Sequence, residues 1–227
     1  MQTGRSSMDD TFLDRLPAEA VVDFEQLGAR RRFPAASTLF VEGDRAHEVL
    51  MLLAGTVKVS VASEDGHEVV LDVFEPGVLL GELSVIDGGR RSATVTALSP
   101  VEVLTIGADA FNALLDRHPR VLRLLLNDVI ARLRTRVRHQ LEFGAGDALG
   151  RVCARLAELG DRYGEPGDAK ILLRSPVSQA DLAAWTGLSR EAVVKAMRAL
   201  RQLGWLENRG RSIVLHEPER VRRRAAQ

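Results

Sequence analysis

The chain has 227 residues and a formal net charge of zero, with 45% hydrophobic, 27% charged and 4% aromatic residues, which is enough for one large or two modest cores. No apolar run approaches the ~18–20 residues that span a bilayer, and the first ten residues lack the apolar stretch of a secretory signal. Cys153 is the only cysteine, which excludes an intrachain disulfide and a cysteine-based metal centre. From these features together we expect a soluble, cytoplasmic protein with no membrane partner and no covalent cofactor.

Short strand-like runs fill most of the first half of the chain. The stretch Leu13 to Leu27 predicts one or two short helices, and alternating or fully apolar runs follow at 49–53, 57–61, 69–73, 93–97 and 101–104. Turn residues separate these runs at intervals of about 8 to 12 residues, which is typical of antiparallel hairpins. The pattern predicts a β-sandwich or a small β-barrel.

One glycine-rich segment between two of these runs carries candidate binding chemistry. It opens with Gly81-Glu82-Leu83 and closes with Arg91-Ser92-Ala93, just before a strand. An arginine offers two parallel donors to a phosphate, Ser92 adds a hydroxyl and a backbone N–H, and Glu82 can accept from a ribose hydroxyl. The alternative is a structural ion pair between a buried carboxylate and an arginine.

The apolar period becomes helical from Ala108, and after Pro119 nothing interrupts it before Gly144. Apolar residues recur there at steps of three and four: Leu122, Leu126, Val129, Leu133 and Val137. A helix of roughly 24 residues is ~36 Å long, more than a small domain can cover. We therefore predict a homodimer seam, the alternative being an amphipathic helix that lies on its own domain.

The last third of the chain predicts a winged helix-turn-helix. A glycine hinge at 144–146 and a helix over 148–159 come first. Ser178 then begins a short helix with capping-box chemistry, Gly187 makes a tight turn, and Ser189 caps a second helix over 190–203. Two strands joined at Asn208-Arg209-Gly210 follow as the wing.

The second of these helices carries candidate base-reading residues. Arg190 and Lys195 can donate to guanine O6 and N7, and Glu191 can accept from cytosine N4. Hydroxyls and helix N-termini at the two caps, and arginines at the wing, would reach the DNA backbone: Ser178, Ser189, Arg209 and Arg211. The alternative is a helical hairpin with a solvated charged face.

The zero net charge hides a gradient along the chain. Residues 1–110 hold nine Lys and Arg against 18 Asp and Glu, whereas residues 178–227 hold ten against five. An acidic first half beside a basic end suits a chain whose C-terminal part alone meets a polyanion. A merely solvated basic tail would show the same counts.

Together these motifs resemble the cyclic AMP receptor protein (Crp/Fnr) family of bacterial transcription regulators over nearly the whole chain. The resemblance rests on Gly81-Glu82-Leu83, Arg91-Ser92-Ala93, the long helix, and Gly187-Leu188-Ser189-Arg190-Glu191 with Lys195. It implies an α+β fold in three parts: a β-roll (double-stranded β-helix or jelly roll) cyclic-nucleotide-binding domain over 1–110, a dimerisation helix over 111–143, and a winged helix-turn-helix over 144–227.

The resemblance also implies roles for individual residues. Glu82 matches the ribose contact of the family, and Arg91 and Ser92 match its cyclic-phosphate contacts. The remaining positions of the ligand-binding set are Gly81, Leu83, Ala93, Arg132, Thr135 and Arg136. The base-reading positions are Arg190, Glu191 and Lys195, which implies TGTGA-like half-sites, and the phosphate-contacting or nearby positions are Ser178, Gln179, Ser189 and Arg211.

Two departures bear on what the protein recognises. Where cyclic AMP sensors of the family have a Thr-Ser pair that contacts adenine, this chain has Arg136 and Val137, with Thr135 one residue away. Arg136 can bind a second phosphate or a purine edge, or form an interchain ion pair. Lys195 stands where many members have arginine and lacks the guanidinium fork. Cyclic AMP is the first expectation for the effector, and cyclic GMP, cyclic di-GMP, another anion or no effector are the alternatives.

The predicted function is that of a homodimeric DNA-binding transcription regulator, not an enzyme, with RNA polymerase as a further partner. A cupin-type metalloenzyme would need clustered histidines, whereas His47 and His67 are isolated and the chain has no His-x-His. We therefore expect no metal site. The remaining alternative is a nucleotide-binding regulatory module that acts on a protein partner instead of DNA.

Overall fold

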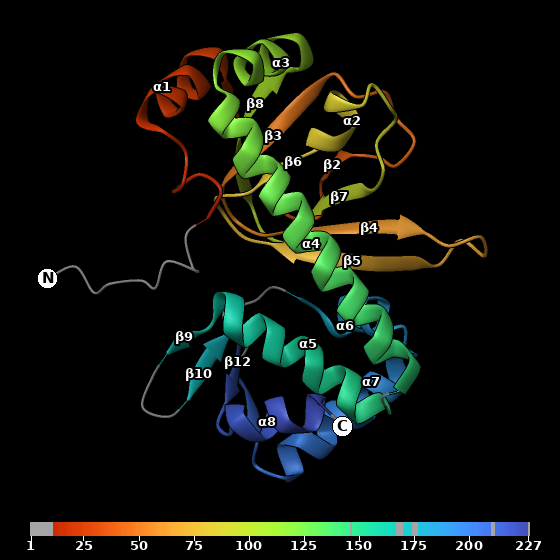
Figure 1. Ribbon diagram of the computed structural model, residues 1–227. Coiled ribbons are helices and arrows are strands. Elements are labelled where there is room, and N and C mark those ends of the chain that lie inside the picture. Colours follow the sequence, from red (N-terminus) through yellow and green to blue (C-terminus); the bar gives the residue numbers. More distant parts are fainter. Residues whose placement is uncertain (1–10, 146, 167–169, 174–176, 210–211, 227) are drawn as a thin grey trace, which may run out of the picture. The chain divides into compact units, whose positions relative to one another are not determined.

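The computed structural model describes residues 11–145, 147–166, 170–173, 177–209 and 212–226 (Figure 1). The chain forms two compact units, Met1–Val61 with Asp72–Arg134 and Ala62–Leu71 with Thr135–Gln227. Among the described residues, no helix combines the length and the apolar character that a membrane span requires.

Eight strands of the N-terminal half form two four-stranded sheets, with strand orders β1-β8-β3-β6 and β2-β7-β4-β5 (Figure 1). The ladders of β8 with β1 and with β3, and of β7 with β2 and with β4, are antiparallel. The strands are β1 (Ala29–Phe33), β2 (Thr38–Phe40), β3 (Glu48–Ala54), β4 (Val57–Ala62), β5 (Glu68–Phe74), β6 (Leu79–Leu80), β7 (Thr94–Ala97) and β8 (Val101–Gly107).

The five strands that alternation predicts are confirmed as β3, β4, β5, β7 and β8. The pattern does not predict β1, because three consecutive arginines hide its period. The charged partner of two of these arginines lies on the neighbouring strand: Arg30 and Arg32 both form ion pairs with Glu102 of β8, each at 2.8 Å. Opposite charges on neighbouring strands stabilise such a pairing by only a few tenths of a kcal/mol to ~1 kcal/mol.

The helices of this half are α1 (Ala18–Leu27), α2 (Glu82–Ile86), α3 (Ala108–Arg117) and α4 (Pro119–Ala145). α1 begins later than predicted because Pro17 stands at its N-cap and residues 12–15 form a turn. Pro119 is the first residue of α4, where its missing N–H costs nothing. α4 includes Gly144 and ends at Ala145, two residues beyond the predicted end at residue 143, and Gly146 of the predicted hinge lies outside the described residues.

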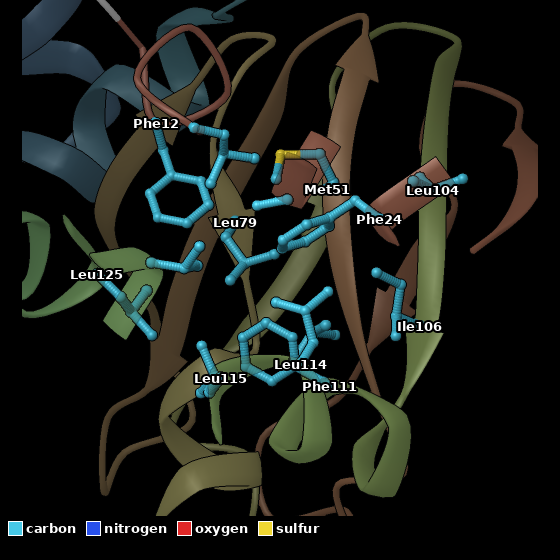
Figure 2. Packing of buried hydrophobic residues seen from close by; sticks show 14 of the residues in the cluster. Phe12, Phe24, Met51, Leu79, Leu104, Ile106, Phe111, Leu114, Leu115 and Leu125 are labelled. Carbon is cyan, nitrogen blue, oxygen red and sulfur yellow. The ribbon is translucent and has the colours of Figure 1, made fainter. Parts of the chain in front are cut away.

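A cluster of buried apolar side chains holds the first unit together (Figure 2). Phe24 of α1 meets Phe111 of α3 edge to face, with ring centroids 6.2 Å apart. Strands β3, β6 and β8 add Met51, Leu79 and Ile106 to this cluster, and the first turns of α4 add Val121 and Leu125. The start of α4 is therefore anchored on the core by one face.

The C-terminal half is a winged helix-turn-helix, as predicted. Its sheet has the strand order β11-β12-β10-β9. The elements are α5 (Ala148–Tyr163), β9 (Glu165–Pro166), β10 (Ile171–Leu173), α6 (Gln179–Thr186), α7 (Arg190–Gln202), β11 (Leu206–Arg209), β12 (Ser212–Leu215) and α8 (Pro218–Ala225). The fold class is therefore α+β, as predicted, whereas the sequence pattern does not predict β9, β10 or α8.

The last helix, α8, packs against α5. Val221 is fully buried, Arg222 pairs with Asp161 at 2.5 Å, and Arg224 pairs at 2.5 Å with Asp147, the N-cap of α5. The Asp147 side chain also accepts from the backbone N–H of Gly150, which is the chief reason that its pKa is lowered. α8 thus contacts both ends of α5.

Candidate functional site

The glycine-rich segment of the first unit folds so that its two ends meet. Gly81 has a left-handed backbone (φ +78°) directly before α2, and its carbonyl accepts from Nη1 of Arg91 at 2.8 Å. A Cβ atom at position 81 would lie 2.3 Å from that same nitrogen. Only glycine fits there, because it tolerates the backbone angle and leaves room for the guanidinium.

Arg91 is buried, with only 4% of its surface exposed. Nη2 donates to the carbonyl of Glu48 at 2.5 Å, and the guanidinium lies over the ring of Phe40, 4.2 Å from the centroid. Burial lowers the pKa of Arg91, although an arginine stays charged at any physiological pH. Its Nε is buried and has no hydrogen-bond partner among the described residues.

An unpartnered buried N–H is costly, on the order of 1–3 kcal/mol, so it indicates a missing acceptor. The acceptor must fit beside a positive, fork-shaped group, and an anionic oxygen of a phosphate does so. The arrangement around Arg91 therefore fits the phosphate of a small ligand. Three other members of the predicted set lie in or near this arrangement: Gly81, Glu82 and Arg132.

Glu82, the first residue of α2, is only 2% exposed and forms an ion pair with Arg132 of α4 at 2.9 Å. Arg132 also donates to the carbonyl of Leu79 at 3.3 Å and lies over Phe74, 5.1 Å from the ring centroid. The predicted alternative of a buried ion pair is therefore present, but the partner is an arginine 50 residues away. A carboxylate has lone pairs for several donors, so this pair leaves Glu82 able to bind a hydroxyl as well.

The other predicted ligand residues differ in their exposure. Leu83 and Ser92 are exposed, Ala93 is buried, and Thr135 is half-buried on α4. Arg136 lies in α4, and its side chain is outside the described part of the chain. The sequence pattern misses Phe40 and Phe74, which stack on the two arginines, because no local signal links them to residues so far away.

In the second unit, side-chain caps mark where the two short helices begin. The Ser178 hydroxyl accepts from the backbone N–H of Asp181 at 3.1 Å, and the Asp181 side chain accepts from the N–H of Ser178 at 3.1 Å. This confirms the predicted capping box. Gly187 ends α6 in the left-handed conformation (φ +64°), and the Ser189 hydroxyl accepts from the N–H of Ala192 to begin α7.

α7 divides its residues cleanly between two faces. Val193, Met197 and Leu200 are buried. The opposite face lines an open hollow with Arg190, Glu191, Val194, Lys195 and Arg198. Val194 and Arg198 are not among the predicted residues, although Val194 lies four residues after Arg190 and Arg198 four residues after Val194, a spacing that could have found them.

Glu191 is the acidic member of this face. Hydrogen bonds from its own backbone N–H and from Ser189 lower the pKa of Glu191, so this carboxylate is an ionised acceptor. Gln179 is the half-buried first residue of α6, and Arg209 of the wing pairs with Glu207 at 3.2 Å. Arg211, the remaining predicted DNA contact, lies outside the described residues.

Across the described ranges, no group of three His, Cys, Asp or Glu side chains could hold a metal ion.

Comparisons with known proteins match both halves of the chain. The profile of the family described as "Cyclic nucleotide-binding domain" matches residues 30–118, and that of the "Crp-like helix-turn-helix domain" matches residues 150–224. The CRP-like cAMP-activated global transcriptional regulator of Mycobacterium tuberculosis is 30% identical over 193 residues, which cover 85% of this chain and 86% of that protein.

Solved structures agree with this match. FixK2 from Bradyrhizobium japonicum superposes with a TM-score of 0.79 over 88% of this chain and 98% of its own, and its 23% identity shows the fold alone. The c-di-GMP-responsive global regulator CLP of Xanthomonas campestris, 25% identical, has a TM-score of 0.76 over 88% of this chain and 99% of its own. This chain therefore belongs to the Crp/Fnr family of transcription regulators, with a cyclic nucleotide-binding domain followed by a DNA-binding helix-turn-helix.

Proposed function

We propose that the protein is a homodimeric, sequence-specific DNA-binding regulator whose activity is controlled by a small phosphate-bearing effector, with cyclic AMP as the first candidate. The observation that carries the effector assignment is the buried Arg91, whose Nε lacks a partner among the described residues. In this proposal residues 1–110 sense the effector, residues 111–143 join the two copies, and residues 144–227 bind DNA.

The residues of the first unit fit a cyclic nucleotide. Arg91 and Ser92 would hold the cyclic phosphate, and Glu82 would accept from the ribose hydroxyl beside its ion pair with Arg132. The M. tuberculosis relative is named as a cAMP-activated regulator, which supports cyclic AMP as the effector. The c-di-GMP response of the Xanthomonas regulator keeps cyclic di-GMP as an alternative, and cyclic GMP is a further one.

The homodimer is supported by the two faces of α4. Val121 and Leu125 are buried in the core of the first unit, whereas Leu126 and Leu133 are 57% and 60% exposed. An apolar stripe that is left uncovered by its own unit is the surface that a second copy of the same helix would bury. This argues against the alternative in which the stripe lies on its own domain.

The DNA-binding unit would read one half-site per copy. Arg190, Glu191 and Lys195 lie on the exposed face of α7, where Arg and Lys can donate to guanine and Glu can accept from cytosine. Two α7 helices about one DNA turn apart, ~34 Å, would enter successive major grooves of a palindrome with TGTGA-like half-sites. The effector would favour this spacing by binding one arrangement of the dimer more tightly than the other. RNA polymerase is the expected further partner.

The effector assignment is tested by comparing Arg91→Lys with Arg90→Lys, its exposed neighbour. We expect calorimetry with cyclic AMP, cyclic GMP and cyclic di-GMP to find one ligand that the wild type binds. Arg91→Lys should weaken that binding at least about tenfold, because an ammonium lacks the fork, while Arg90→Lys should not. Unchanged affinity in a folded Arg91→Lys variant, or no binding of any of the three by the wild type, would overturn the assignment.

The DNA assignment is tested separately with a gel shift on a symmetric TGTGA duplex over a salt series. We expect binding that weakens as salt rises, because phosphate contacts release counterions. Failure to shift any duplex, with or without the nucleotide that binds, would leave a regulatory module that acts on a protein partner.

A further inference from the structure

One side chain on the DNA-facing surface of α7 does not fit the chemistry of its neighbours. Val194 is 40% exposed, yet the four residues that line the same hollow are all charged: Arg190, Glu191, Lys195 and Arg198. The adjacent Val193 is completely buried. Val194 is therefore exposed because it lies on the outer face of α7, and packing inside the unit does not account for a valine there.

Helical geometry places Val194 in the middle of this surface. It lies four residues after Arg190 and four before Arg198, in one row, and three residues after Glu191, which shares the neighbouring row with Lys195. At ~1.5 Å per residue it is ~6 Å along the axis from each arginine. Successive base pairs are ~3.4 Å apart, so Val194 and Arg190 would face different base pairs.

An isolated exposed valine is ordinary on a protein surface, but here it stands where arginine or lysine would add affinity for DNA. The one apolar group that the major groove presents is the C5-methyl group of thymine. A valine whose two methyl groups point out of a charged face can cover that methyl and remove both from water.

We propose that Val194 is a specificity-determining residue that contacts the C5-methyl group of one thymine in each half-site. The inference rests on the proposed binding of DNA by α7 and adds to it a base contact without a hydrogen bond. It assigns to α7 a mixed recognition surface, in which charged side chains read base edges and Val194 reads a methyl group.

The test uses the full-length protein and duplexes that differ by single methyl groups. A half-site is first selected from a random duplex pool, and each thymine of the selected site is then replaced singly by uracil, which lacks only the methyl. We expect one thymine per half-site at which uracil weakens binding by the wild type about fourfold, the factor for one methyl-sized group left in water. In Val194→Ala that uracil-to-thymine ratio of dissociation constants should fall to below about 1.5.

Lys195→Ala is the matched control from the neighbouring row of the same face. It should weaken binding to every duplex yet keep the uracil-to-thymine ratio of the wild type. In a duplex that carries cytosine instead of thymine at that position, replacing this cytosine by 5-methylcytosine should strengthen binding by the wild type and not by Val194→Ala. Circular dichroism checks that both variants are folded. We expect them to be, because alanine has the highest helix propensity.

Two results would overturn the inference while leaving the proposed function intact. One is a wild type that binds its selected site but discriminates uracil at no position. The other is a folded Val194→Ala variant that keeps the wild-type ratio. A wild type that selects no duplex would overturn the proposed DNA recognition, and the role of Val194 with it.

Discussion

Gly81 is the residue on which the geometry around Arg91 depends. A side chain at this position meets two penalties, the left-handed backbone and a Cβ atom 2.3 Å from Nη1 of Arg91. Gly88, with φ +70° and open space where a Cβ atom would lie, carries only the first penalty. Comparing substitutions at Gly81 and Gly88 therefore separates the free-energy cost of a left-handed backbone from the cost of displacing the Arg91 side chain.

We expect Gly88→Ala to lower the free energy of unfolding by about 1 kcal/mol, as a left-handed non-glycine residue does. Gly81→Ala should cost about 2–4 kcal/mol, and it alone should weaken nucleotide binding, because the guanidinium must move. Urea denaturation and calorimetry measure the two effects. Equal costs for the two variants would show that Gly81 is not required by its contact with Arg91.

Cys153 lies at the buried face of α5, and burial raises the pKa of its thiol from an ordinary value of 9.0 to about 11. In the unfolded chain the thiol loses its proton near pH 9, whereas in the folded chain it keeps the proton until about pH 11. The thiol therefore contributes stability that is complete below pH 9 and is lost as the pH rises towards 11.

The free energy of unfolding of the wild type should fall more steeply between pH 9 and pH 11 than that of Cys153→Ala, by up to ~1.4 kcal/mol per pH unit. Denaturant titrations across this range measure the difference in slope. Parallel profiles for the two proteins would contradict the shifted pKa of a buried thiol. The same burial predicts slow reaction of the native thiol with a disulfide reagent at about pH 8.

Individual residues also show how far the sequence alone can predict the site. Residue types and spacing are enough to propose Arg91, Glu82 and the α7 residues, because the chemistry of a forked donor or a helical face is local. The partners of these residues are not predictable in the same way. Arg132 reaches Glu82, and Phe40 reaches Arg91, only through tertiary packing across tens of residues.

At the scale of elements, the sequence predicts periodic segments well and irregular ones poorly. The helical and alternating patterns of α4, α7, β3 and β4 are long enough to be recognised. β9 and β10 have two and three residues, too few for a period, and four arginines in α8 obscure its single buried position. α8 is held by tertiary contacts that no local pattern indicates.

The attachment of α8 to α5 gives a prediction about which contact matters. Val221 is fully buried, whereas the Arg222–Asp161 ion pair is partly open to solvent. Val221→Ala should cost about 1–3 kcal/mol by leaving a cavity, and Arg222→Ala should cost less than about 1 kcal/mol. Thermal or urea unfolding of the two variants measures this. A larger loss in Arg222→Ala would mean that charge, not packing, fastens α8.

At the scale of the whole molecule, the proposed function requires two copies of the chain. The uncovered stripe on α4 provides the surface, and Leu126 and Leu133 are its most exposed members among the leucines. Placing a charge at both positions should separate the copies without disturbing the buried face at Val121 and Leu125, because the two sets lie on different sides of the helix. The variant Leu126→Asp with Leu133→Asp is the test, and Val22→Asp, an exposed valine on α1, is its matched control.

The most direct test of the central claim is sedimentation equilibrium of the full-length protein, alone and with a symmetric TGTGA duplex, with and without the nucleotide that it binds. We predict a dimer that binds one duplex for every two chains, and a monomer that no longer binds tightly in the double aspartate variant. A wild type that sediments as a monomer and leaves every duplex free would contradict this prediction.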